Sequence, residues 1–141
     1  DVLGRYPNTI TICGNCDAPG TAEVEQTFDL LGVNGLITHG HTLHVKTSPL
    51  PLFYRAQELD ARLTVFGHTH TPTLYVENGR VFLNPGSLSY PRGYTVCTYA
   101  IAEFNCDRDD DEASGSRVTA NFTFYTLEGD PIPAFDLTHT Y

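Results

Sequence analysis

Two pairs of histidines, each with one residue between them, constrain the fold of this chain more than any other feature. The first pair lies in residues 38–41 (Thr-His-Gly-His) and the second in residues 67–70 (Gly-His-Thr-His). A short apolar run precedes each pair, at residues 36–37 and 63–66, and both runs are typical of buried strands. Histidine is the commonest metal ligand, and the edges of α/β sheets are where ligands bind. The two pairs therefore predict a metal site at the edge of a sheet.

The segment between the two pairs predicts one helix. Ser48 and Pro49 are typical of a helix N-cap and first helical position. Apolar residues then recur on one helical face, which predicts a helix that runs to about Asp60. A strand, a helix and a second strand in this order predict a right-handed parallel crossover and hence an α/β fold.

The rest of the chain predicts mainly strands and hairpins. The dipeptides Asn34-Gly35 and Asn78-Gly79 are typical of tight hairpin turns. The acidic run 107–116 has contiguous carboxylates without the spacing of a calcium loop, so we expect a solvated hairpin loop there. The expected strands are residues 9–13, 27–33, 36–38, 62–66, 73–77, 80–83, 95–104 and 118–127.

Length and composition favour one globular domain over residues 1–141. The chain has 141 residues, 40% hydrophobic residues and a formal net charge of -9. This charge argues against extended nucleic-acid binding but permits a phosphate substrate when divalent cations are bound. No apolar run is long enough to span a membrane, and we expect a cytoplasmic protein. Because the chain begins at Asp1 and contains no methionine, we expect its N-terminus to be incomplete.

Four segments that follow predicted strands carry the residues with metal or phosphate chemistry. Asn15 offers an amide oxygen, and His39, His68 and His70 offer ring nitrogens. Such mixed nitrogen and oxygen ligands suit manganese, iron, zinc or nickel better than calcium. Taken singly, a histidine at a strand end is more often a hydrogen-bonded structural residue than a ligand. The four segments are residues 14–17, 38–41, 67–70 and 84–87.

These segments, in this order, resemble the motifs of the calcineurin-like metallophosphoesterases, in particular the compact bacterial and archaeal YfcE-like phosphodiesterases. That family reads Asp-x-His, Gly-Asp, Gly-Asn-x-Asp, His-Gly-His, Gly-His-x-His and Asn-Pro-Gly-Ser, and this sequence contains the last four between Gly14 and Ser87. The resemblance implies a four-layer α/β fold, a β-sandwich flanked by helices, here without its first two strands.

The resemblance also implies a ligand set for two divalent metal ions. Asn15, His39 and His68 match protein ligands of one ion, and His70 matches a ligand of the other. The Asp-x-His and Gly-Asp motifs, which carry the remaining ligands in the family, do not precede Asn15 in this sequence. Manganese is the expected metal, with zinc, iron or nickel as alternatives.

The implied activity is that of a metallophosphoesterase, most specifically a phosphodiesterase that acts on small phosphodiesters or nucleotides through a dinuclear site and metal-bound hydroxide. Many relatives carry a histidine that protonates the leaving group where this chain has Cys16. The predicted catalytic residues are therefore Asn15, Cys16 and His41, with His41 as the alternative proton donor. We expect the 141-residue chain alone to be nearly inactive.

Substrate contacts are predicted for the loop that contains the Asn-Pro-Gly-Ser motif. Asn84, Ser87 and Arg92 are the candidates, and the alternative is that this segment is a proline-glycine turn with a packing role.

Two other interpretations stay open at this point. The chain is either an enzyme or a catalytically inactive interaction scaffold, as in the retromer subunit of the same fold. A weaker interpretation is a mononuclear zinc site made of His39, His68, His70 and a carboxylate such as that of Asp17. A homo-oligomer is possible.

Overall fold

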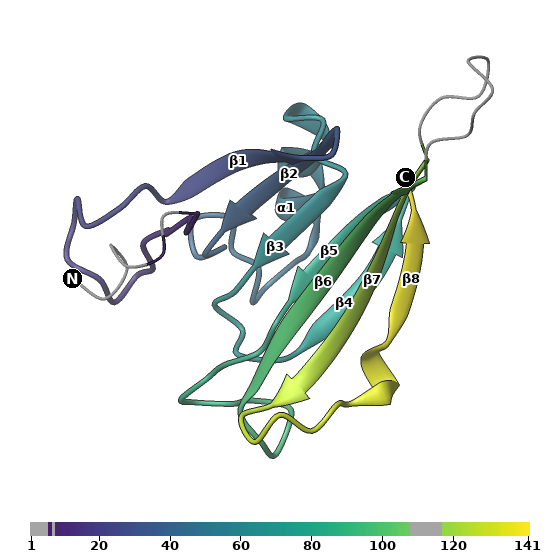
Figure 1. Ribbon diagram of the computed structural model, residues 1–141. Helices are drawn as coiled ribbons and strands as arrows, with labels where there is room; N and C mark the ends of the chain where they lie inside the picture. The colour runs from purple at the N-terminus through teal and green to yellow at the C-terminus, as the bar shows by residue number, and fades with distance from the viewer. Residues whose placement is uncertain (1–5, 7, 108–116) are drawn as a thin grey trace.

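The computed structural model describes residues 6, 8–107 and 117–141 (Figure 1). Most of these residues belong to two β-sheets. The elements are β1 (Glu25–Leu30), β2 (Val33–Thr38), α1 (Leu50–Glu58), β3 (Leu63–Phe66), β4 (Thr73–Glu77), β5 (Arg80–Asn84), β6 (Thr98–Asp107), β7 (Arg117–Thr126), the 3-10 helix η2 (Pro133–Phe135) and β8 (Leu137–Thr140).

The first sheet has the strand order β1-β2-β3-β5-β4. Its three central strands are parallel, and α1 connects β2 to β3, so the predicted parallel crossover is confirmed. Thr38, the last residue of β2, pairs with Phe66, the last residue of β3, and β5 ends beside them. The segments that follow β2, β3 and β5 therefore leave the sheet at the same edge.

Helix α1 covers one face of this sheet. The helix begins after Pro49, and the Ser48 hydroxyl accepts a hydrogen bond from the N–H of Leu50 at 3.2 Å. Its apolar side packs on the central strands because leucine, phenylalanine and alanine recur at helical spacing. This core contains Leu36, Leu52, Phe53, Ala56, Ala61, Phe66 and Phe82.

The second sheet, β6-β7-β8, packs on the opposite face of the first. Every second residue of β7 is buried against the first sheet, as expected for a strand with one face on a core. Figure 1 shows the long β6–β7 hairpin running beside β4 and β5. The predicted α/β sandwich is confirmed, and within the described residues one of the expected helical layers is present. The shared core contains Val33, Leu63, Val81, Leu83, Val118, Ala120, Phe122 and Phe124.

The predicted turn at Asn34-Gly35 is wrong, because both residues lie inside β2. The chain turns instead at Leu31 and Gly32, which both have positive φ, at 55° and 81°. Gly35 is needed for packing: it pairs with Phe28 of β1, and a Cβ on Gly35 would lie 2.1 Å from the Phe28 ring. Gly35 therefore marks a close side-chain approach and not a turn.

The predicted strand at residues 9–13 is also wrong. This segment lies beside the start of β1 but makes one isolated bridge there, between Ile12 and Glu23. A run with strand composition becomes a strand only when a partner continues the hydrogen-bonding ladder.

The strand expected at residues 27–33 is wrong in its bounds, because β1 ends at Leu30 and the chain turns before β2. The later β predictions agree closely with the structure. The second predicted hairpin is present as β4 and β5, with Asn78 and Gly79 at its turn, and β6 and β7 match the two later strands. Strand β8 was not predicted. The acidic loop expected at residues 107–116 lies outside the described residues except for Asp107, which ends β6. No helix in the described part of the chain is long and apolar enough to cross a membrane.

Candidate metal centre

The edge where β2 and β3 end holds a cluster of three histidine rings. His39 and His41 belong to the first histidine loop (residues 39–41), and His68 to the second histidine loop (residues 67–71). The ring centroid of His39 lies 5.1 Å from that of His41 and 5.0 Å from that of His68. The N–H of Gly67 donates to the carbonyl of His39 at 3.3 Å, which joins the two loops. The structure therefore brings together side chains that are 27–29 positions apart in the sequence.

Burial and nearby positive groups lower the pKa of both His39 and His68. Desolvation lowers the pKa of His39, and the nearby His68 and His41 lower it further. Desolvation also lowers the pKa of His68, and the positive charge of Lys46 adds to this effect. A histidine binds a metal ion through a neutral ring. The lowered pKa of each ring therefore favours the form that a ligand requires.

The Nδ1 atoms of His39 and His41 lie 3.0 Å apart. A hydrogen bond between two ring nitrogens needs a proton on one and a lone pair on the other. When His39 donates from Nδ1, its Nε2 keeps a free lone pair and His41 carries its proton on Nε2. The pair can therefore present one ligand nitrogen and one proton donor.

The segment that contains Asn15 lies against His39. A Cβ built on Gly14 would be 3.0 Å from Nε2 of His39, so the glycine leaves the room that this ring occupies. Asn15 is exposed, and its side-chain amide donates to the sulfur of Cys16 at 3.4 Å. The carboxylate of Asp17 accepts from the N–H of Gly14 at 2.6 Å and raises the pKa of His39 slightly against the larger lowering effects.

His70 is not one of the three clustered rings, but it lies near enough to His39 and His68 to lower the pKa of both. Its Nδ1 lies 2.9 Å from the carbonyl oxygen of Tyr90. A carbonyl only accepts, so the neutral ring of His70 carries its proton on Nδ1 and leaves the lone pair of Nε2 free. This is the arrangement in which metal-binding histidines are usually held. The N–H of Arg92 also donates to the carbonyl of His70 at 2.9 Å.

The predicted substrate contacts lie at different depths. Asn84 is fully buried, and its amide bonds to Gly67, Thr69 and Gly86. The hydroxyl of Ser87 accepts from the N–H groups of Ser89 and Tyr90. Arg92 is exposed. The geometry thus favours a packing role for Asn84 and Ser87 and leaves Arg92 accessible.

The nitrogen and oxygen donors at this edge of the sheet fit a divalent transition metal, but the described residues supply only part of a ligand set. Among the described residues, no group of three His, Cys, Asp or Glu side chains converges closely enough to hold an ion. The lowered pKa of His39 and His68, the free lone pair on His70 and the space left by Gly14 nevertheless suit a nitrogen-rich metal site.

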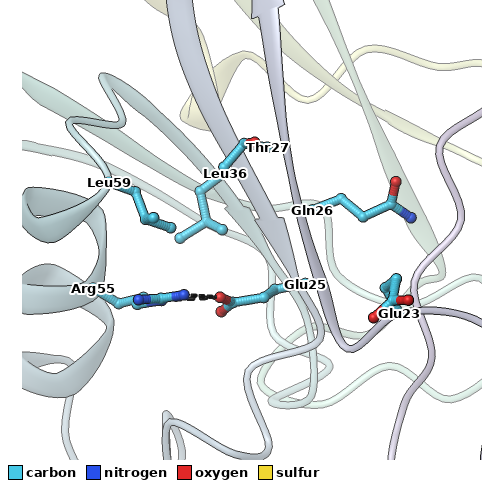
Figure 2. Close-up of a pocket in the computed structure, with 7 residues that line it drawn as sticks. All are labelled: Glu23, Glu25, Gln26, Thr27, Leu36, Arg55 and Leu59. Carbon is cyan, nitrogen blue, oxygen red and sulfur yellow. Dashed lines mark hydrogen bonds and ion pairs between the residues drawn. The ribbon is translucent and has the colours of Figure 1, made fainter.

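A separate groove of about 440 Å³ lies between β1 and α1 (Figure 2). Arg55 of α1 reaches across it to Glu25 of β1 and also pairs with Glu58 on its own helix. Its lining residues come from β1, β2, α1 and the chain beside them, so the groove does not include the histidine loops.

Sequence reasoning missed two residues that the structure places beside the histidines. Tyr90 holds His70 through a main-chain carbonyl, which has no signal in the sequence. Lys46 acts on His68 through its charge, and a single lysine in a loop gave no reason to select it.

Comparison with known proteins supports a phosphoesterase. Residues 1–107 match the calcineurin-like phosphoesterase superfamily domain. A probable metallophosphoesterase of Bacillus subtilis, YsnB, is 37% identical over 94 residues, which are 67% of this chain and 56% of that protein. This chain spans less than two-thirds of the length of the curated metallophosphoesterases that it matches.

Solved structures show the same fold. A predicted phosphoesterase from Streptococcus pneumoniae superposes with a TM-score of 0.74 at 28% identity, covering 92% of this chain and 69% of that one. Vps29 of Entamoeba histolytica, in a complex with Zn²⁺, superposes with a TM-score of 0.60 at 19% identity, covering 92% of this chain and 66% of that one. From its sequence and its fold, this chain belongs to the calcineurin-like phosphoesterase superfamily.

Proposed function

We propose that this protein is a metal-dependent phosphodiesterase that hydrolyses small phosphodiesters or nucleotides. The observation that carries the proposal is the pair of rings of His39 and His68, with centroids 5.0 Å apart where adjacent parallel strands end and with the pKa of each lowered. Family membership makes a phosphoryl group the expected target of such a site.

The proposed ligands of one ion are Asn15, His39 and His68, and His70 is a proposed ligand of a second ion. Bound divalent ions would supply Lewis acidity toward the phosphoryl oxygens and lower the pKa of water. Manganese is the proposed metal. Zinc is the alternative with support, since the Vps29 structure that resembles this chain was solved with Zn²⁺.

Two positive side chains near the histidines favour an anionic substrate. Lys46 is close enough to His68 to lower its pKa, and the backbone of Arg92 is bonded to His70. The chain as a whole is acidic, with a net charge of -9, and the position of these two cations beside the site favours attraction of a phosphate. We assign the direct substrate contact among the predicted loop residues to Arg92.

His41 is the proposed proton donor to the leaving group. When His39 uses its Nε2 lone pair as a ligand, its Nδ1 proton bonds to His41, whose own proton is then on Nε2. Cys16 is exposed and lies beside Asn15, so a contribution to the same step stays a prediction.

The test is manganese-dependent hydrolysis of bis-p-nitrophenyl phosphate by the complete gene product. We expect His68→Ala to abolish turnover, because it removes a proposed ligand. The matched control is His139→Gln, which changes a histidine on β8 in the second sheet and should leave turnover unchanged. Undiminished turnover in His68→Ala overturns the proposal.

The second candidate function is a protein-interaction scaffold of the same fold. The observation that favours it is the partial metal set among the described residues. Metal analysis of the purified complete protein separates the two functions: bound manganese or zinc in stoichiometric amount favours the enzyme, and metal-free protein favours the scaffold. The cytoplasmic location, the single domain and a homo-oligomer stay predictions.

A further inference from the structure

Two residues of the second histidine loop have a backbone conformation that their own residue types do not favour. His68 and His70 have φ values of 66° and 60°, in the left-handed region that residues with a Cβ rarely occupy. Such conformations persist only where the surrounding structure holds them, and they are concentrated at functional sites. The left-handed conformations of His68 and His70 therefore need support from residues outside their own loop.

Asn84 is placed to do this. It is the last residue of β5, beside the end of β3, and its side chain is fully buried. The side-chain amide of Asn84 donates to the carbonyl of Gly67 at 3.1 Å and to the hydroxyl oxygen of Thr69 at 2.9 Å. These two acceptors lie on either side of His68 in the chain, so one amide group fixes both neighbours of this residue.

The other end of the Asn84 side chain ties the loop to the next turn. Its amide oxygen accepts from the N–H of Gly86 at 3.0 Å. Gly86 has φ of 89°, and a Cβ there would lie 2.0 Å from the hydroxyl of Thr98, which donates to the carbonyl of Pro85. Because both donor and acceptor ends are bonded, the orientation of the amide is fixed.

The same turn carries the partner of His70. The hydroxyl of Ser87 accepts from the N–H of Tyr90 at 2.9 Å, and the carbonyl of Tyr90 then faces Nδ1 of His70. Asn84 thus connects, through one turn, the loop that holds His68 to the segment that orients His70.

We propose that Asn84 is a positioning residue that holds His68 and His70 in the left-handed conformation from which each would reach its own proposed metal ion. This inference deepens the proposed function and rests on it. Asn84 itself touches neither metal nor substrate; it acts through Gly67, Thr69 and the turn at residues 85–90.

The test compares Asn84→Ala and Asn84→Asp with the unmodified complete protein. The aspartate keeps the acceptor for Gly86 but lacks the two amide donors. We measure Co²⁺ binding by calorimetry, and ¹³Cα and ring ¹⁵N shifts of His68 and His70 by NMR in metal-free protein. Both variants should weaken Co²⁺ binding about 10–100-fold, and the ¹³Cα shifts of both histidines should change.

The control separates positioning from stability. Val81→Ala removes buried methyl groups from the opposite end of the same strand. It should lower the free energy of unfolding but leave Co²⁺ affinity and the histidine shifts unchanged. Unchanged Co²⁺ affinity and histidine shifts in Asn84→Ala overturn the proposal.

Two further measurements keep the result decisive. If Asn84→Ala does not fold, Thr69→Val removes one of the two acceptors of the Asn84 amide, together with the acceptor for the N–H of Thr71, and it should weaken Co²⁺ binding by a smaller factor. Failure of the unmodified protein to bind Co²⁺ contradicts the proposed function instead. In that case the NMR shifts of the metal-free variants still decide whether Asn84 sets the conformation of His68 and His70.

Discussion

The two histidine loops have the same spacing of histidines but obtain their shape in different ways. In the first loop, Gly40 takes the left-handed conformation, with φ of 91°, between the two histidines. In the second loop, His68 and His70 take it themselves, and Thr69 lies between them with its hydroxyl bonded to Asn84. A left-handed residue with a Cβ costs about 1–2 kcal/mol. The first loop therefore follows from its own sequence, and the second depends on the rest of the fold.

The comparison predicts the largest stability effect at Gly40. In Gly40→Ala, the left-handed backbone would cost about 1–2 kcal/mol, and the new Cβ would lie 2.9 Å from Cγ2 of Val45. We expect the free energy of unfolding to fall by at least about 2 kcal/mol in total, as measured by urea denaturation.

Gly79→Ala is the matched control for Gly40→Ala. Gly79 has φ of 70°, and a Cβ there has nothing within 4 Å, so this variant measures the backbone cost alone. An equal loss in both variants would show that the contact with Val45 does not matter.

Histidine-to-asparagine substitution should affect the free energy of unfolding differently in the two loops. Asparagine tolerates the left-handed region better than histidine. His68→Asn should therefore keep the free energy of unfolding or raise it by about 0.5 kcal/mol. His39→Asn relieves no strain and loses the packing of a half-buried ring, so it should lower this free energy.

Urea denaturation of the metal-free protein checks both variants. Calorimetry with Mn²⁺ should show that each loses metal affinity, since each removes a proposed ligand. The comparison between the loops fails if His68→Asn is the more destabilising of the two.

The smallest stability effect is expected where the first loop meets the Asn15 segment. Gly14→Ala places a Cβ 3.0 Å from Nε2 of His39 without a left-handed backbone. The ring must move by a few tenths of an ångström, and the free energy of unfolding should change by no more than about 0.5 kcal/mol. Mn²⁺ affinity should fall more clearly, because the displaced nitrogen is a proposed ligand.

Gly67→Ala is the control for this position. Its Cβ would meet His39 at 3.7 Å, which is ordinary van der Waals contact. Calorimetry should show weaker Mn²⁺ binding in Gly14→Ala than in Gly67→Ala. Equal affinities would mean that the ring of His39 has room to adjust.

The sheet was predictable where local pattern and tertiary partner agree. The turn at Asn78-Gly79 was found because its two residues suit a hairpin and both flanking strands pair there. Asn34-Gly35 is the same dipeptide, but Phe28 packs on Gly35, and the turn lies at Leu31 and Gly32 instead. A dipeptide cannot show which aromatic ring will cover it.

The candidate metal site was likewise predictable where short spacings indicate it and not where contacts between distant segments decide it. The four histidines that lie at the sheet edge were selected from spacing and strand ends, and three of their rings do cluster. The role of Asn84 was not found, since its burial and its bonds to Gly67 and Thr69 depend on β5 lying beside β3.

The sequence by itself determined the order of strands around one crossover helix, the nitrogen donors, and the motifs that place the chain in its superfamily. These depend on local residue chemistry and short spacings. Only the tertiary structure decided that Asn84 is buried, that the carbonyl of Tyr90 selects the tautomer of His70, and that two histidines take a left-handed backbone. The reason is that burial, hydrogen-bond partners and the support of a costly backbone come from segments distant in the chain.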